Sequence, residues 1–455
     1  MGQCTPLPSG NRRKEDRAPV NVPFSKIIAR PSLPMPNPDV ISLGEYMENG
    51  APYGHPIYLA IGETWSEIAP GLAAELGKTE IHSHGYHLSM YGIPELHQVA
   101  SRRIRAEHRL DEVAEEGDSY EVSITWNGTR QAMSDFARLL LDRYDDGRRP
   151  ITFAAGPSWD YAGVFGPLGY ATEYVPLTPE REFRPSIDDL RQLVVSAVGS
   201  TRMRPGIIVL NAQHNPTAVN WDASFVRDAV SLAIEHEVPI LLDDAYYAVH
   251  DEGVTPTSSL QLLLQAVKDE RIARDLPWLA VRSLGKQFHC SGWGLGLMVA
   301  SPPVLDLLVN GYRLRHSLSH GGVLQAAMAR WLAEDSADTF LAEQRQEYKR
   351  KRRFFRTTLE QDLGYPADKI HTGECTPYSL FAVPEKYSGS PESVEAFRRS
   401  CFSETGVMLG SAWPWPLSGR VNHLPYLRMF LGPGVEVLGD ALSRMASAGY
   451  VYDAM

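Results

Sequence analysis

The chain has 455 residues, of which 43% are hydrophobic and 22% are charged, and its formal net charge at pH 7 is −11. This length suits a large core with a second, smaller lobe, and the composition is that of an ordinary globular protein. The acidic balance gives no general attraction to nucleic acid or to anionic membranes, so we expect neither as a partner.

The sequence carries no pattern typical of export or membrane insertion. No apolar run reaches the length that spans a bilayer, and the N-terminal residues lack the apolar core of a signal peptide. The cysteines stand too far apart for a zinc-type pair or a dense disulfide framework; they are Cys4, Cys290, Cys375 and Cys401. We therefore expect a cytoplasmic protein in a reducing compartment.

The predicted elements begin after a polar N-terminal segment. Residues 1–38 are rich in proline and arginine and show no helical or strand period, which predicts a flexible arm. Further on, apolar runs of strand length alternate with helical patterns, which predicts βα units around a mainly parallel sheet. The strand candidates are 122–126, 151–154, 207–211, 239–242, 279–283 and 295–300. A charged helix over 341–359 and short strands then predict a smaller α+β lobe.

The chemically suggestive residues follow these strands. Ligands of open α/β sheets bind beyond the carboxyl ends of the strands. The first candidate strand is followed by Asn127, Gly128, Thr129 and Arg130, and then by a helical pattern over 133–141. Free backbone N–H groups, a glycine and a threonine hydroxyl suit an anion, although many strand-to-helix turns carry Gly and Thr for capping alone.

Three later strand ends carry an amide, a carboxylate and an amine. Asn215 follows one strand and Asp243 the next, and a carboxylate that ends an apolar run needs a partner unless it caps a helix. Lys286 leaves a further strand in a chain where arginine supplies most of the positive charge. A desolvated lysine loses its proton readily and becomes an amine nucleophile; the alternative is a side chain that reaches back to the surface.

Taken together and in this order, these stretches resemble the class I/II aminotransferase family of fold-type I enzymes, which depend on pyridoxal 5'-phosphate (PLP). The resemblance covers about residues 55–435. It implies a PLP-transferase fold of type I, with a mainly parallel seven-stranded sheet in a large PLP-binding domain (76–334). A smaller α+β domain would combine 39–75 with 335–455. The resemblance also implies a homodimer with shared active sites.

The resemblance assigns roles to individual residues. Lys286 matches the lysine that holds PLP as a Schiff base and then serves as general base, and Asp243 matches the aspartate that keeps the pyridine nitrogen protonated. Tyr246 and Asn215 match the pair that hydrogen-bonds the 3'-oxygen. The remaining matches are the phosphate cup, the phosphate-binding serine, the ring stacked on the pyridine and the arginine that clamps the substrate carboxylate: Gly128, Thr129, Ser283, Trp159 and Arg428.

Some positions depart from the family pattern. Gly294 stands where the family has an arginine for the cofactor phosphate, and we hypothesise that Arg130 supplies that charge. Arg315 stands near the place of a second substrate arginine; the alternative is a surface arginine. Tyr86, His87 and Tyr91 all lie near the family's tyrosine that enters the neighbouring site, and the sequence does not choose among them.

The implied activity is chemistry at Cα of an amino-acid substrate through an external aldimine and a quinonoid, most simply transamination in a specialised, secondary metabolic pathway. The alternatives are a carbon–sulfur lyase or an enzyme that eliminates from S-adenosylmethionine, and a PLP-binding protein without turnover. We expect no metal, because His82, His84 and His87 have no carboxylate or cysteine beside them. Cys290 is expected to be a small buried hydrophobe.

Overall fold

The structure is a computed structural model that describes residues 39–60, 67–78, 85–269, 276–318, 320–413 and 424–452. It consists of two compact units, Met1–Pro56 and Ile57–Met455. In the first unit, helix α2 (Asp39–Glu48) is followed by a turn in which the Tyr46 hydroxyl donates to the Gly54 carbonyl at 3.0 Å. The arm predicted for 1–38 lies outside the described residues.

The second unit contains a seven-stranded sheet with the order β2-β8-β7-β6-β5-β3-β4. Only β8 runs antiparallel to its neighbours, so the predicted mainly parallel seven-stranded sheet is confirmed. All six strand candidates are present. The strands are β2 (Glu121–Thr125), β3 (Arg149–Gly156), β4 (Ala171–Pro176), β5 (Met203–Leu210), β6 (Ile240–Asp243), β7 (Trp278–Ser283) and β8 (Gly296–Ala300).

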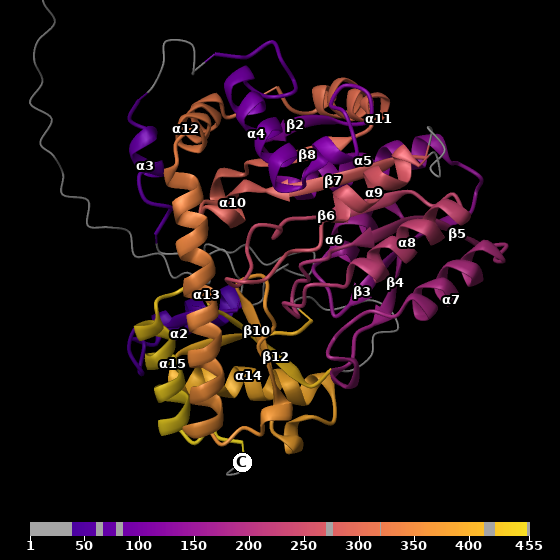
Figure 1. Cartoon of the computed structure of the whole chain (residues 1–455). Helices are drawn as coiled ribbons and strands as arrows, with labels where there is room; N and C mark the ends of the chain where they lie inside the picture. The colour runs from indigo at the N-terminus through magenta and orange to yellow at the C-terminus, as the bar shows by residue number, and fades with distance from the viewer. Residues whose placement is uncertain are drawn as a thin grey trace, which may run out of the picture. The chain divides into compact units, whose positions relative to one another are not determined.

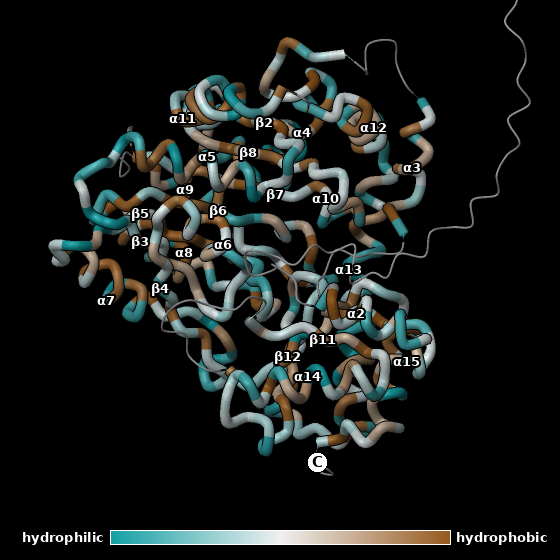
Figure 2. The backbone as a smooth tube through the Cα atoms, turned by 180° about the vertical axis from the view of Figure 1, so that it is seen from behind, coloured by the Kyte–Doolittle hydropathy of each residue, from teal (hydrophilic) through white to brown (hydrophobic). Residues whose placement is uncertain are grey.

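Helices pack on this sheet (Figure 1), and hydrophobic residues are frequent along its strands (Figure 2). Apolar side chains of the strands and of the surrounding helices form one buried core. An apolar strand buried on both faces is what a parallel sheet requires. The helices are α3 (Leu72–Glu75), α4 (Pro94–Glu107), α5 (Gly128–Arg143), α6 (Tyr161–Phe165), α7 (Ile187–Val198), α8 (Ala223–Glu235), α9 (Ser259–Lys268), α10 (Leu284–Gln287), α11 (Pro302–Asp306) and α12 (Gly322–Leu332).

A second, five-stranded sheet has the order β1-β11-β12-β10-β9 and its own apolar core. Its strands are β1 (Ile57–Leu59), β9 (Ile370–His371), β10 (Tyr378–Ala382), β11 (Val407–Ser411) and β12 (Tyr426–Phe430), and its helices are α13 (Ser336–Gln361), α14 (Pro391–Thr405) and α15 (Val435–Ser447). The predicted charged helix is confirmed as part of α13. The predicted limits of the two domains stay a prediction.

The order of the large sheet brings separate parts of the sequence together at the carboxyl ends of its parallel strands. Strands β2, β5, β6 and β7 all run in the same direction, so their carboxyl ends meet. The turn into α5 follows β2, Asp243 is the last residue of β6, and α10 begins directly after β7. Among the described helices, none is long and apolar enough to cross a membrane.

Candidate active site

Lys286 lies on the short helix α10, which begins directly after the carboxyl end of strand β7. Ser283 caps this helix, because its Oγ accepts the Lys286 N–H at 3.3 Å. The half-buried ammonium Nζ lies 4.6 Å from the ring centroid of Tyr246 and 6.0 Å from that of Trp159. Three residues that the sequence predicted as site residues, from three separate segments, therefore surround one space.

Asp243 is buried beside this space, with 4% of its surface exposed. Its Oδ2 accepts the Tyr161 hydroxyl at 2.7 Å and its Oδ1 accepts the Ala245 N–H at 3.3 Å. Burial raises the pKa of Asp243, while the positive charge of Lys286 and these hydrogen bonds act in the opposite direction. The carboxylate is therefore held in place but remains short of positive charge.

Tyr161 and Asn211 belong to this arrangement although the sequence did not single them out. Asn211 donates to the Asp243 carbonyl at 2.6 Å and accepts the Asn215 N–H at 2.9 Å. It therefore ties the segment after β5 to the end of β6. An asparagine directly after a buried strand was a usable signal, and so was a tyrosine two residues after Trp159.

Arg428 reaches the same region from the small sheet. It lies on β12, is 4% exposed, and donates from Nη1 to the Asn215 Oδ1 at 3.1 Å and from Nη2 to the Ala60 carbonyl at 2.7 Å. Its guanidinium carbon lies 4.5 Å from the ring centroid of Tyr378, whose hydroxyl is 3.2 Å from that of Tyr246. The Nε of Arg428 is buried and has no hydrogen-bond partner within the described ranges.

The turn between β2 and α5 forms an uncapped helix N-terminus. Within the described part of the chain, no side chain caps the first turn of α5, and Gly128 adopts a φ of 74°. Its N–H donates to the Gly294 carbonyl at 2.8 Å. Gly294 has a φ of 67°, and a Cβ added there would lie 2.7 Å from the Trp126 carbonyl oxygen. The position of the family's arginine thus admits no side chain unless this turn moves.

Arg130 lies beside the same turn. Its guanidinium carbon is 4.5 Å from the ring centroid of Trp159, and its Nη1 donates to the Asp160 Oδ2 at 2.9 Å. The Arg130 side chain is 46% exposed. The side chain therefore joins the turn after β2 to the ring of Trp159, and it is accessible to a ligand between them.

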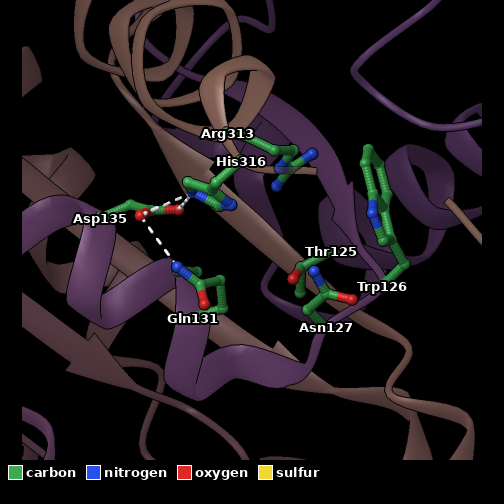
Figure 3. Close-up of a pocket in the computed structure, with 8 residues that line it drawn as sticks. Thr125, Trp126, Asn127, Gln131, Asp135, Arg313 and His316 are labelled. Carbon is green, nitrogen blue, oxygen red and sulfur yellow. Dashed lines mark hydrogen bonds and ion pairs between the residues drawn. The ribbon is translucent and has the colours of Figure 1, made fainter. Parts of the chain in front are cut away.

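A partly buried cluster of polar side chains lies next to the turn (Figure 3). Asp135 on α5 accepts the His316 Nε2 at 3.1 Å on each carboxylate oxygen, and Gln131 donates to it at 3.0 Å. Arg313 stacks on Trp126 at 4.4 Å and donates to the carbonyls of Met90 and Ile124 at 2.8 and 2.7 Å. These contacts fasten the 310 helix that carries Arg313 and Arg315 to β2 and α5.

The other sequence candidates lie outside the space around Lys286. Arg315 is exposed, with its guanidinium carbon 5.8 Å from the Tyr312 ring centroid. Tyr91 accepts the Ile124 N–H at its carbonyl, Tyr86 is 78% exposed, and the His87 N–H donates to the His320 Nε2. His82 and His84 fall outside the described residues.

Cysteine and metal chemistry find no support in the described residues. Cys290 is buried, and burial raises the pKa of its thiol to about 12, so the reactive thiolate is disfavoured. The described ranges contain no group of three or more histidine, cysteine, aspartate or glutamate residues that could hold a metal ion.

The chemistry of the cluster fits PLP. An amine (Lys286) suits the aldehyde, and a buried carboxylate (Asp243) suits the pyridine nitrogen. The uncapped N-terminus of α5 suits the phosphate, and the ring of Trp159 offers a flat apolar face beside the amine. These four features lie at one edge of the sheet.

Sequence comparison supports the same kinship. The family model for aminotransferase class I and II matches residues 128–423. Aromatic-amino-acid aminotransferase 2 of Thermococcus litoralis is 24% identical over 357 residues, which cover 78% of this chain and 81% of that protein. An LL-diaminopimelate aminotransferase of Nitratidesulfovibrio vulgaris is 28% identical over 325 residues, covering 70% and 74%.

Solved structures share the fold. A Thermus thermophilus aspartate aminotransferase double mutant superposes with a TM-score of 0.69 at 20% identity, covering 90% of this chain and 94% of that one. Substrate-bound BacF of Bacillus subtilis gives a TM-score of 0.72 at 20% identity, covering 94% and 98%. The predicted aspartate-aminotransferase-like fold is therefore confirmed, and the chain belongs to the class I and II aminotransferase family and is a PLP-dependent enzyme.

Proposed function

We propose that the enzyme transfers the amino group of an amino-acid substrate to a 2-oxo acid in a specialised metabolic pathway, with Lys286 as its central residue. The observation that carries this proposal is the position of the Lys286 amine between the rings of Tyr246 and Trp159, beside the buried Asp243. PLP, when bound, supplies an electron sink for the negative charge that develops at the substrate Cα.

In this proposal Lys286 both holds the cofactor and moves the Cα proton. The half-buried amine lies against the rings of Tyr246 and Trp159, which position it beside the space proposed for the substrate Cα. Asp243 would pair with the protonated pyridine nitrogen of the cofactor. The Tyr161 hydroxyl and the Ala245 N–H orient that carboxylate, so it needs no reorganisation when the ring binds.

Asn215, Tyr246 and Arg428 complete the proposed substrate side. Asn215 and Tyr246 would hold the 3'-oxygen of the cofactor. Arg428 binds the substrate carboxylate, and its buried, unpartnered Nε leaves a donor for the second oxygen of a bidentate pair. The contact between Arg428 and Asn215 couples the binding of the substrate to the position of the cofactor.

The turn after β2 is proposed to bind the phosphate of the cofactor. Gly128 forms the turn, Thr129 presents a first-turn N–H group of α5, Ser283 provides a hydroxyl, and Arg130 provides the positive charge that the family takes from the position of Gly294. The close packing of Gly294 explains why that charge has to come from elsewhere. The altered phosphate site supports a specialised rather than a general metabolic role.

A homodimer would complete the site. The segment that carries Arg315 contacts the turn after β2 yet exposes Leu318 (55%). The contact between His87 and His320 brings a second segment close to it, in which Tyr86 and Leu88 are 78% and 102% exposed. Exposed apolar side chains of this size are typical of a surface that another subunit covers. We assign Arg315 and Tyr91 to substrate binding in that assembly.

The first test is spectroscopic. The purified protein should show the visible absorbance of lysine-bound PLP, and Lys286→Ala should lose it while Lys268→Ala, at an exposed lysine on α9, keeps it. Survival of the absorbance in Lys286→Ala would refute the assignment.

The second test concerns the reaction. Amino acids, cysteine conjugates and S-adenosylmethionine are supplied with and without a 2-oxo acid, and the products are identified by mass spectrometry. Turnover that requires the 2-oxo acid supports transamination. Elimination products formed without it would replace the proposal by a lyase activity.

A further inference from the structure

A large cleft lies next to the proposed site, and none of the residues assigned above lines it. Its volume is about 740 Å³. One side is formed by the end of β3 and the segment after β4, and the other by the small sheet and its connections. Its lining includes Gly156, Pro157, Leu177, Thr178, Trp413 and Tyr426, and acidic side chains stand at its rim.

The cleft adjoins the proposed site on both sides. Pro157 stands two residues before Trp159, the ring beside Lys286. Tyr426 stands two residues before Arg428 on β12, and side chains two apart on a strand point to the same face. The ring of Trp413 packs so closely over Gly156 that an added Cβ would lie 2.5 Å from it. A ligand held at Arg428 therefore has this cleft within reach along β12.

The lining of the cleft is about half apolar, and its apolar part forms the floor. Leu177, Val383 and Tyr426 are buried, with exposed fractions of 3%, 2% and 5%, and Trp413 contributes an indole. A volume of this size lies within the roughly 300–1,000 Å³ range of sites for whole small molecules, well above what a single amino-acid side chain fills. The cleft therefore suits a bulky apolar group.

The rim of the cleft is acidic. Glu180, Asp368 and Glu385 are exposed there, and the ammonium of Lys369 lies 3.5 Å from the Asp368 carboxylate. Burial raises the pKa of the Tyr426 phenol to about 12, and the negative charges of Asp368 and Glu180 add to this effect. A second carboxylate at the far end of a ligand would thus meet a repulsive field.

We propose that this cleft receives the distal part of the amino-acid substrate, and that the substrate carries a bulky, apolar, non-acidic group larger than a proteinogenic side chain. This inference rests on the proposed function, because it takes Arg428 as the group that holds the substrate carboxylate. It excludes dicarboxylic amino acids as preferred substrates.

The test measures binding to the PLP-loaded enzyme by calorimetry, with ligands that lack an amino group and therefore do not react. The ligand 3-(biphenyl-4-yl)propanoate should bind at least about tenfold more tightly than propanoate, since it buries two rings. The same ligand with a carboxylate on the outer ring should bind at least about tenfold more weakly than the parent. Equal affinity for the biphenyl ligand and propanoate would overturn the inference.

Variants locate the binding. Thr178→Trp places an indole in the cleft and should remove the advantage of the biphenyl ligand, whereas the matched control Thr201→Trp, at an exposed position outside the lining, should keep it. The double change Glu180→Lys with Glu385→Lys should strengthen binding of the dicarboxylate. If Thr178→Trp binds the biphenyl ligand as the wild type does, or the double change leaves the dicarboxylate unaffected, the cleft is not the site.

The proposed function is judged by a separate reading. The wild-type enzyme is mixed with L-alanine, and the visible absorbance of lysine-bound PLP and the release of pyruvate are followed. Reaction with alanine, combined with weak biphenyl binding, would sink the inference and leave the proposed function intact. Tight biphenyl binding, combined with no reaction of alanine or of any amino acid in the panel above, would contradict the proposed function and leave the inference intact.

Discussion

Gly294 offers a sharp test of how the turn after β2 is held. In Gly294→Ala, a residue with a side chain has to adopt a φ of 67°, which costs about 1–2 kcal/mol. Its Cβ would also lie 2.7 Å from the Trp126 carbonyl oxygen, and such overpacking typically costs about 1–3 kcal/mol. We therefore expect the free energy of unfolding to fall by about 2–5 kcal/mol.

The same change should weaken the binding of PLP. The displaced backbone belongs to the segment that leads into Gly128, whose N–H bonds to the Gly294 carbonyl, so the first N–H groups of α5 shift with it. A loss of about 1.4 kcal/mol in phosphate binding corresponds to a tenfold higher PLP dissociation constant. Titration of the apoenzyme with PLP, followed by visible absorbance, measures this constant, and urea unfolding followed by circular dichroism measures stability.

Gly292→Ala is the matched control. A Cβ at Gly292 meets no atom within 4 Å, so its effect on stability should stay within about 0.5 kcal/mol. If Gly294→Ala and Gly292→Ala have the same stability and the same PLP affinity, the close packing of Gly294 does not hold the turn, and the reasoning is refuted.

Three further predictions concern neighbouring residues. Arg130→Ala should raise the PLP dissociation constant about tenfold in the absorbance titration, because it removes a charge-assisted contact. The control Arg138→Ala, at an exposed position on the same helix, should leave this constant unchanged. An unchanged constant in Arg130→Ala would show that Arg130 does not bind the phosphate. Tyr161→Phe should lower kcat about tenfold and shift the pH profile of kcat, because Asp243 loses a hydrogen bond that lowers its pKa. The control Tyr170→Phe loses a buried hydrogen bond to the Ala137 carbonyl and should change stability alone. Identical pH profiles of kcat in Tyr161→Phe and the wild type would contradict this prediction. Burial raises the pKa of Asp244 to about 7, so its protonated form stabilises the fold below about pH 4, and this stability is lost as the pH rises through about 7. Asp244→Asn should therefore gain up to about 4 kcal/mol over the wild type between these pH values in urea unfolding, whereas a pH-independent difference would speak against it.

Much of the large sheet was predictable because its strands are buried on both faces and read as continuous apolar runs. Strand β4 (Ala171–Pro176) was not predicted, because it is the outermost strand of the sheet, where Glu173 is exposed and most other positions are half-buried. An edge strand of this kind lacks the apolar signal on which the prediction depends. The same limit applies to every half-exposed strand.

The candidate site divides in a similar way. Lys286, Asp243 and Asn215 stand at or within five residues of the carboxyl ends of apolar strands, so their positions at that end of the sheet follow from the order of the elements. Tyr161 and Asn211 were missed because their roles depend on which neighbouring segment lies opposite, and this is set by tertiary packing. The packing of Gly294 against Trp126 likewise needs coordinates, because a glycine in sequence does not say what it approaches.

The small sheet constrains how the protein is made. Strand β1 pairs with β11, and Arg428 donates to the carbonyl of Ala60, 368 residues earlier in the chain. A ribosome that adds about 5–20 residues per second exposes β1 long before its partner strand emerges. Until then β1 is an unpaired strand edge, and the arginine proposed to receive the substrate does not yet exist. A chain truncated before β11 would therefore keep the strands of the large sheet but leave β1 unpaired and able to pair with another chain.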